Sequence, residues 1–189
     1  MSESELTTNP MDRSTIDTHA YRETMGLFAT GVTVILARED SDVRGMTANG
    51  VTSLSLDPTL IIVCPSKKSH MSSYLKRGRE FTLNILSEKQ EAVANYFACA
   101  SAQPVLPKFE FVTWPAAGSV PRLRQCLGAV ACRVSEIHEG GDHWIVVGEV
   151  IGLYRGPAPH RPLLFFGGGY HSPAKDEPEH LQPSSDPYE

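Results

Sequence analysis

The chain has 189 residues, of which 41% are hydrophobic and 21% charged, a composition typical of a globular protein with one well-buried domain. Its net charge of -5 divides into -2 for residues 1–16 and -4 for residues 173–189, which leaves +1 for residues 17–172. A nearly neutral folded part argues against a nucleic-acid partner, and the absence of any run of about eighteen apolar residues argues against a membrane span.

The two ends of the chain differ from its middle. Residues 1–16 are polar and acidic and lack the basic start and apolar stretch of a signal peptide, which predicts a cytoplasmic protein. Residues 173–189 are acidic and carry four prolines. We expect both ends to be disordered tails that flank a single domain at residues 17–172.

The first predicted element is a helix that begins at Asp17 or Thr18, where either side chain can cap it. Tyr21, Met25 and Phe28 follow at helical spacing, and Gly31 ends the helix. The β-branched residues at 32–37 predict a strand, residues 38–45 a hairpin connection, and residues 46–56 a second strand with a kink at Asn49–Gly50.

The remaining elements alternate between strands and short helices. Ser87 and Gln90 have the spacing of a capping box, which predicts that a helix begins there. In chain order we expect a turn at Asp57–Pro58, a fully buried strand ended by Pro65, a short helix at 69–78 and a strand at 80–86. The capped helix follows, with Val93, Tyr96 and Phe97 on its apolar face, and then a looser region at 99–121. A long hairpin of residues 127–139 and 143–156 and one last strand at 161–171 complete the chain.

The predicted strands are mostly neighbours in the sequence, and a regular βαβ alternation is missing. This order favours a mainly β fold, an antiparallel barrel with a few flanking helices, over a doubly wound parallel sheet.

Most enzyme motifs are missing from the chain. It has no G-x-S-x-G elbow, no phosphate-binding G-x-x-x-x-G-K-[ST] loop and no H-E-x-x-H pair. His138 and His143 suggest no third metal ligand, so no metal site is predicted. The four cysteines form no C-x-x-C pair, and Cys64 and Cys132 lie in apolar runs as reduced thiols would.

A cluster of hydrogen-bonding groups remains around the apolar run at 59–65. Thr47, Asn49, Thr52 and Ser53 precede it, and Gly45 and Gly50 would let a ligand approach the backbone. The lysines and serines at 66–69 follow it where a loop becomes a helix, so helix amides and lysine charges could hold a phosphate. The simpler interpretation is a polar turn with solvated lysines.

Four segments together resemble the short-chain flavin reductases, the split-barrel reductase components of two-component flavin-dependent monooxygenases. They are "FATGVTVILA", "GMTANGVTSLSLDPTLIIVCPSKKS", "FTLNILSEKQEAVANYFA", and the pair "GDHWIVVGEV" with "RPLLFFGGGYH". The resemblance covers roughly residues 18–171 and implies a homodimeric split antiparallel β-barrel of Greek-key, FMN-binding type.

The resemblance also implies a set of site residues. His143 matches the histidine usually placed near the nicotinamide. The residues that match flavin-contacting positions are Thr47, Ala48, Asn49, Gly50, Thr52, Ser53, Cys64, Ser66, Lys67, Ser69, Phe81, Asn84 and Tyr170.

The implied activity is an NAD(P)H:flavin oxidoreductase that reduces FMN or FAD and supplies reduced flavin to a partner monooxygenase. Hydride passes between the two cofactors, so the protein needs no nucleophile of its own. Two alternatives stay open: a flavin-binding module without turnover, and an oxidase similar to the pyridoxamine-phosphate oxidases.

The chain departs from the family pattern in two places. Gly50 stands where relatives often have serine, which removes one hydroxyl. Gly167, Gly168 and Gly169 stand where relatives often carry arginines that could serve a cofactor phosphate. Their loss favours NADH over NADPH.

Overall fold

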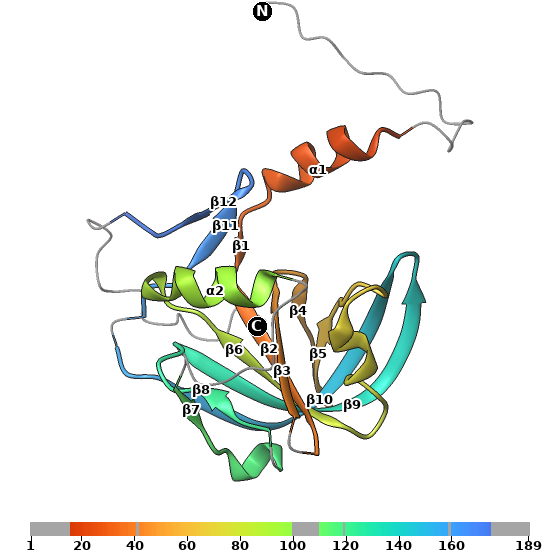
Figure 1. Ribbon diagram of the computed structural model, residues 1–189, viewed down its shortest axis with the longest axis vertical. Helices are drawn as coiled ribbons and strands as arrows, with labels where there is room; N and C mark the ends of the chain where they lie inside the picture. The colour runs from red at the N-terminus through yellow and green to blue at the C-terminus, as the bar shows by residue number, and fades with distance from the viewer. Residues whose placement is uncertain (1–15, 41, 100–109, 119, 159, 175–189) are drawn as a thin grey trace, which may run out of the picture.

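The described residues form mainly β-strands. One helix, α1 (Thr18–Gly26), projects away from the strands, and a second, α2 (Glu91–Ala98), packs against them (Figure 1). The computed structural model describes residues 16–40, 42–99, 110–118, 120–158 and 160–174. The predicted tails lie almost entirely outside these ranges, so the domain boundary at 17–172 stays a prediction.

Seven antiparallel strands make the main sheet, in the order β3-β2-β6-β9-β10-β5-β4. Their bounds are β2 Thr33–Glu39, β3 Asp42–Ala48, β4 Val51–Leu56, β5 Thr59–Val63, β6 Glu80–Ile85, β9 Gly128–Gly140 and β10 His143–Arg155. The mainly β, antiparallel fold predicted from the sequence is confirmed, as is the long hairpin, now β9 and β10.

The two edges of this sheet are joined by a link of only two residues. β3 lies at one edge and β4 at the other, and only Asn49 and Gly50 separate them in the chain. The predicted kink is therefore a full break between two strands. Because so short a link cannot span a flat sheet of seven strands, the sheet curls until its edges approach each other at Asn49–Gly50.

The C-terminal segment differs from its prediction. In place of one last strand, β11 (Leu164–Phe166) and β12 (Gly169–His171) form a hairpin. Gly167 and Gly168 turn the chain with positive φ angles of 58° and 82°, which glycine adopts without strain. β11 also pairs with β1 (Thr30–Gly31), while β7 (Phe111–Val112) and β8 (Arg122–Leu123) form a separate pair.

The helices begin where the sequence predicts, but the first ends at Gly26 and not at Gly31, so Phe28 lies beyond it. Asp17 caps α1 (Thr18–Gly26), because its carboxylate accepts hydrogen bonds from the N–H groups of His19 and Ala20. The capping box of Ser87 and Gln90 is present before α2 (Glu91–Ala98). Short 3₁₀ helices complete the set: η1 His70–Ser73, η2 Glu88–Gln90 and η3 Pro115–Ala117.

The core has two parts, one on each face of β2. Val34 and Leu36 pack on one face with Phe97 of α2, and Ile35 and Ala37 pack on the other. Burial on both faces explains why the sequence of β2 is continuously apolar. The prediction of a fully buried β5 is wrong, because burial alternates along it and leaves Leu60 and Ile62 half-buried.

Candidate functional site

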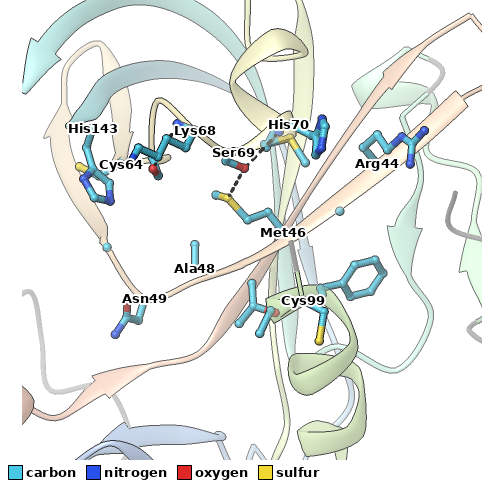
Figure 2. Close-up of a pocket in the computed structure, with 17 residues that line it drawn as sticks. Arg44, Met46, Ala48, Asn49, Cys64, Lys68, Ser69, His70, Cys99 and His143 are labelled. Atoms are coloured by element: carbon cyan, nitrogen blue, oxygen red, sulfur yellow. Dashed lines mark hydrogen bonds between the residues drawn. The ribbon is translucent and has the colours of Figure 1, made fainter. Parts of the chain in front are cut away.

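A cavity of about 510 Å³ lies where β3 ends, beside the loop after β5 and the tip of the β9–β10 hairpin (Figure 2). Its walls combine hydroxyls, thiols and basic groups with a few apolar side chains. The lining residues are Arg44, Gly45, Met46, Thr47, Ala48, Asn49, Gly50, Cys64, Ser66, Lys68, Ser69, His70, Met71, Phe97, Ala98, Cys99 and His143.

The polar loop after β5 is held by its own hydrogen bonds. The N–H of Lys68 donates to Ser66 Oγ at 3.3 Å, and the N–H of Ser69 donates to the Ser66 carbonyl at 2.9 Å. Ser69 Oγ accepts from the N–H of Met71 at 3.1 Å and donates to Met46 Sδ at 3.2 Å. These amides already donate hydrogen bonds within the loop. The cavity therefore offers an anion mainly side-chain donors, and fewer free backbone N–H groups than the sequence indicated for the start of a helix.

The hairpin tip brings His143 to this loop. Ser66 and His143 form an antiparallel bridge, and the N–H of Trp144 donates to the Pro65 carbonyl at 2.9 Å. His143 Nδ1 lies 2.8 Å from Asp142 Oδ1. This hydrogen bond lowers the pKa of Asp142, so the carboxylate is ionised near neutral pH. An ionised carboxylate can only accept, so Nδ1 carries the proton and Nε2 of the neutral ring is an acceptor.

Eight of the site residues implied by the family resemblance line this cavity: Thr47, Ala48, Asn49, Gly50, Cys64, Ser66, Ser69 and His143. Thr47 also fixes α2, because its hydroxyl donates to the Ala94 carbonyl at 2.6 Å.

The other nominated residues lie elsewhere. The ammonium group of Lys67 lies 3.5 Å from Glu139 and 4.6 Å from the centre of the Trp144 ring, while Lys68 lines the cavity in its place. Ser53 is an exposed residue of β4, and Tyr170 packs its ring edge-on against Phe165.

Phe81 and Asn84 are buried in the core. Phe81 belongs to the cluster that contains Cys132, and its ring approaches Gly148 so closely that a Cβ there would lie 2.8 Å away. The Asn84 amide donates to the Val34 carbonyl at 3.0 Å, and its oxygen accepts from the N–H of Leu123 at 2.8 Å. Neither side chain lines the cavity.

A second cavity, of about 840 Å³, adjoins the first and shares Asn49, Gly50 and Cys64 with it. Its walls are mostly apolar, and Thr52 also belongs to them. The Oγ1 atom of Thr30 is buried, and among the described residues it has no hydrogen-bond partner. The apolar contributors to the walls are Tyr21, Met25, Phe28, Val51, Ile62, Ile145 and Phe165.

Several cavity residues were not nominated by the sequence. Arg44 and Met46 lie on the same strand as Ala48, and alternate residues of a strand share a face, so this signal was available in the sequence. His70 and Thr30 come from other elements and gave no signal. Gly45 does not hold the backbone open for a ligand, because the ring of Phe97 occupies the space that a Cβ would need.

The described residues contain no group of three or more metal-ligating side chains. They also contain no helix long and apolar enough to span a membrane. All four cysteines are free, and burial raises the pKa of Cys132 to about 12.

The chain resembles proteins of known activity over most of its length. A flavin-dependent monooxygenase reductase subunit, HsaB of Mycobacterium tuberculosis, is 36% identical over 169 residues, which cover 87% of this chain and 88% of that protein. An NADH-dependent FAD reductase of Streptomyces globisporus is 37% identical over 160 residues, covering 84% and 87%.

Solved structures agree with these matches. The Streptomyces globisporus NADH:FAD oxidoreductase SgcE6, in complex with NAD and FAD fragments, superposes with a TM-score of 0.78 at 35% identity and covers 85% of this chain and 94% of that chain. Flavin reductase PheA2 gives a TM-score of 0.76 at 35% identity, covering 85% and 100%. Residues 25–174 match the flavin reductase like domain, and the chain therefore belongs to the flavin reductase family.

Proposed function

We propose that this protein is an NADH-dependent flavin reductase, which reduces FMN or FAD and supplies the reduced flavin to a partner monooxygenase. The observation that carries this proposal is the pair of adjoining cavities, one polar and basic and one apolar, in a chain of this family. Relatives named as NADH-dependent reductases and as monooxygenase reductase subunits support the co-substrate and the partner.

The residues present fit a flavin. A flavin has a planar ring with polar edges and a phosphorylated tail, and the two cavities meet at Asn49, Gly50 and Cys64. The orphaned hydroxyl of Thr30 is a buried polar group that a bound ligand would satisfy. Ala48, Asn49, Gly50 and Thr52 would hold the ring, and Cys64, Ser66, Lys68 and Ser69 the tail.

A bound flavin supplies the redox chemistry, because it accepts hydride directly from a dihydronicotinamide. The protein's contribution is to hold both rings in contact and to keep one face of the flavin open. His143 would accept a hydrogen bond at Nε2 from the carboxamide of the nicotinamide, and Asp142 fixes the tautomer that permits this. Thr47 would support the site by joining β3 to α2, and Phe81 and Asn84 by packing in the core.

We also propose that the working form is a homodimer. α1 has no buried residue, and the apolar side chains on it and just after it remain exposed, with Met25 at 49% and Tyr21 at 58% on the helix and Phe28 at 70% beyond its end. All three face the second cavity, so a second copy seated on α1 would complete that cavity's wall. Phe28→Asp should shift the protein from dimer to monomer in sedimentation velocity; an unchanged dimer would place the interface elsewhere.

The four free cysteines and the nicotinamide co-substrate favour a cytoplasmic location, which we include in the proposal. The catalytic domain would occupy residues 17–172.

The test is a steady-state assay with the purified full chain. NADH or NADPH is mixed with FMN or FAD, and loss of the nicotinamide absorbance band is followed. We expect catalysed NADH oxidation that requires flavin and is slower with NADPH. If flavin binds and NADH loss does not exceed the protein-free rate, the chain is a binding module; peroxide formation that depends on an organic amine and ignores NADH would identify an oxidase.

A further inference from the structure

Positive groups lie at two separate ends of the first cavity. Lys68 lies toward His143, and its charge contributes to the lowered pKa of Asp142. Arg44 and His70 lie on the opposite side, with Ser69 and Met46 between the two ends (Figure 2). A single phosphate bound near Lys68, Ser66 and Ser69 leaves the second positive end unused.

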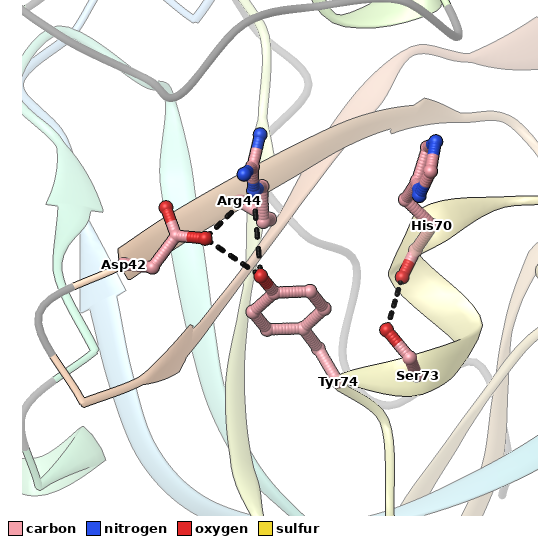
Figure 3. Close-up of polar contacts among 5 residues, drawn as sticks. All are labelled: Asp42, Arg44, His70, Ser73 and Tyr74. Carbon is pink, nitrogen blue, oxygen red and sulfur yellow. Dashed lines mark hydrogen bonds and ion pairs between the residues drawn. The ribbon is translucent and has the colours of Figure 1, made fainter.

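Arg44 is held in one orientation by its neighbours (Figure 3). Its Nε donates to Asp42 Oδ2 at 2.9 Å and to the Tyr74 hydroxyl at 3.3 Å. The Tyr74 hydroxyl in turn donates to the same Asp42 oxygen at 2.7 Å, and this bond raises the pKa of Tyr74. Only Nε is used, and among the described residues no partner engages the two terminal nitrogens of Arg44.

A guanidinium whose Nε is fixed and whose terminal N–H groups are available is suited to a phosphate. The planar fork matches two phosphate oxygens, and because it is already oriented, little side-chain entropy is lost on binding. The side chain of Arg44 is 30% exposed, so it is sheltered from bulk solvent yet open to the cavity.

The position of Arg44 along β3 separates it from the ring end. Arg44 and Ala48 are four residues apart on one strand and share a face. Four residues of extended strand span about 13 Å. If the ring lies at Ala48 and Asn49, a group that contacts Arg44 belongs to the far part of the ligand.

We propose that Arg44 forms a second phosphate subsite that binds the AMP phosphate of FAD, with Asp42 and Tyr74 as its positioning residues and His70 beside it. FMN lacks this phosphate, so the subsite makes FAD the preferred flavin. The assignment rests on the proposed function, because it assumes that a flavin occupies the first cavity.

A purely structural role for Arg44 is the competing explanation, since the trio of Asp42, Arg44 and Tyr74 connects β3 to η1. That connection exists without Arg44, because Tyr74 donates to Asp42 directly. A structural role would change stability, whereas the subsite predicts a change in flavin selectivity.

The experiment measures the Kd of FAD and of FMN by flavin fluorescence, without NADH, for wild type, Arg44→Gln and a matched control. The control is Arg124→Gln, because Arg124 also donates through Nε to a carboxylate, Glu110 at 2.7 Å, and is not among the cavity residues. Arg44→Gln should weaken FAD binding about ten- to a hundredfold and FMN binding less than about twofold, the range for one charged hydrogen-bonded contact. Tyr74→Phe should shift FAD in the same direction by a smaller factor, and the control should change neither.

Equal weakening of FAD and FMN would overturn the proposal, because Arg44 would then hold the phosphate common to both. No change in either Kd would overturn it as well. A raised Michaelis constant for NADH with an unchanged FAD Kd would assign the anion to the nicotinamide dinucleotide instead. If Arg44→Gln fails to fold, Arg44→Lys replaces it, because it keeps the charge and loses the fork. Failure of wild type to oxidise NADH while it binds FAD more tightly than FMN would refute the reductase and leave this subsite standing.

Discussion

Replacing Thr30 with Val should change stability and flavin affinity in opposite directions. The two side chains have nearly the same volume, so the substitution removes the hydroxyl and leaves the packing in place. In the free protein, Oγ1 of Thr30 is buried with no partner among the described residues, and such a group costs about 1–3 kcal/mol. Val should therefore stabilise the fold by about 1 kcal/mol, which raises Tm by about 2–4 °C for a protein of this size.

Flavin affinity should fall in the same variant. If a bound flavin provides the missing partner, its hydrogen bond to Thr30 contributes about 0.5–1.5 kcal/mol, so the Kd rises about 2- to 12-fold. Thermal unfolding without flavin and fluorescence titration with flavin measure the two effects separately. Thr30→Ser keeps the hydroxyl and should retain the affinity. A lower Tm together with an unchanged Kd would refute the reasoning, because the hydroxyl would then be satisfied within the protein.

Other variants separate the scaffold from the site. Asn84→Ala should lower the free energy of unfolding by about 3 kcal/mol, because it removes several buried hydrogen bonds and leaves the Leu123 N–H unpaired. Chemical denaturation measures this loss. A stable variant with weakened flavin binding would instead make Asn84 a ligand contact. His143→Ala should raise the Michaelis constant for NADH about tenfold and leave the flavin Kd unchanged, and equal kinetics would remove His143 from the site. Alkylation of native protein should modify exposed Cys99 and spare buried Cys132, whose pKa is raised to about 12, and bound flavin should protect Cys64. Peptide mass spectrometry before and after flavin addition measures the order of labelling. Early labelling of Cys132 would contradict the prediction.

Local chemistry in the sequence predicted the elements whose signals are local. The capping box at Ser87, the Asp17 cap and the long hairpin each depend on a few adjacent residues, and each is present. The last segment, residues 161–171, was predicted as one strand. Two of its three consecutive glycines take positive φ angles and reverse the chain, a choice that depends on pairing with β1.

The site residues were predictable only where the position of a strand end decides which residues line the cavity. Residues 47–50 line the cavity because β3 ends there. Lys67 and Lys68 are adjacent in a loop, where no strand period decides which one points inward. Asn84 looked like a ligand contact, but β6 is buried on both faces from residue 81 to residue 84, so Asn84 lies in the core. His70 lines the same cavity as Arg44 only because η1 packs on β3, which no local pattern encodes.

The two-residue connection between β3 and β4 gives any ligand at that point an unusual mechanical role. No hydrogen-bonded ladder joins these two strands among the described residues, so the two-residue link and side-chain packing hold the margins of the curled sheet there. A molecule that touches Ala48 on one side and Thr52 on the other would clamp the opposing margins together. Amide hydrogens along both margins should then exchange more slowly when the clamp is present, although they belong to opposite ends of the strand order.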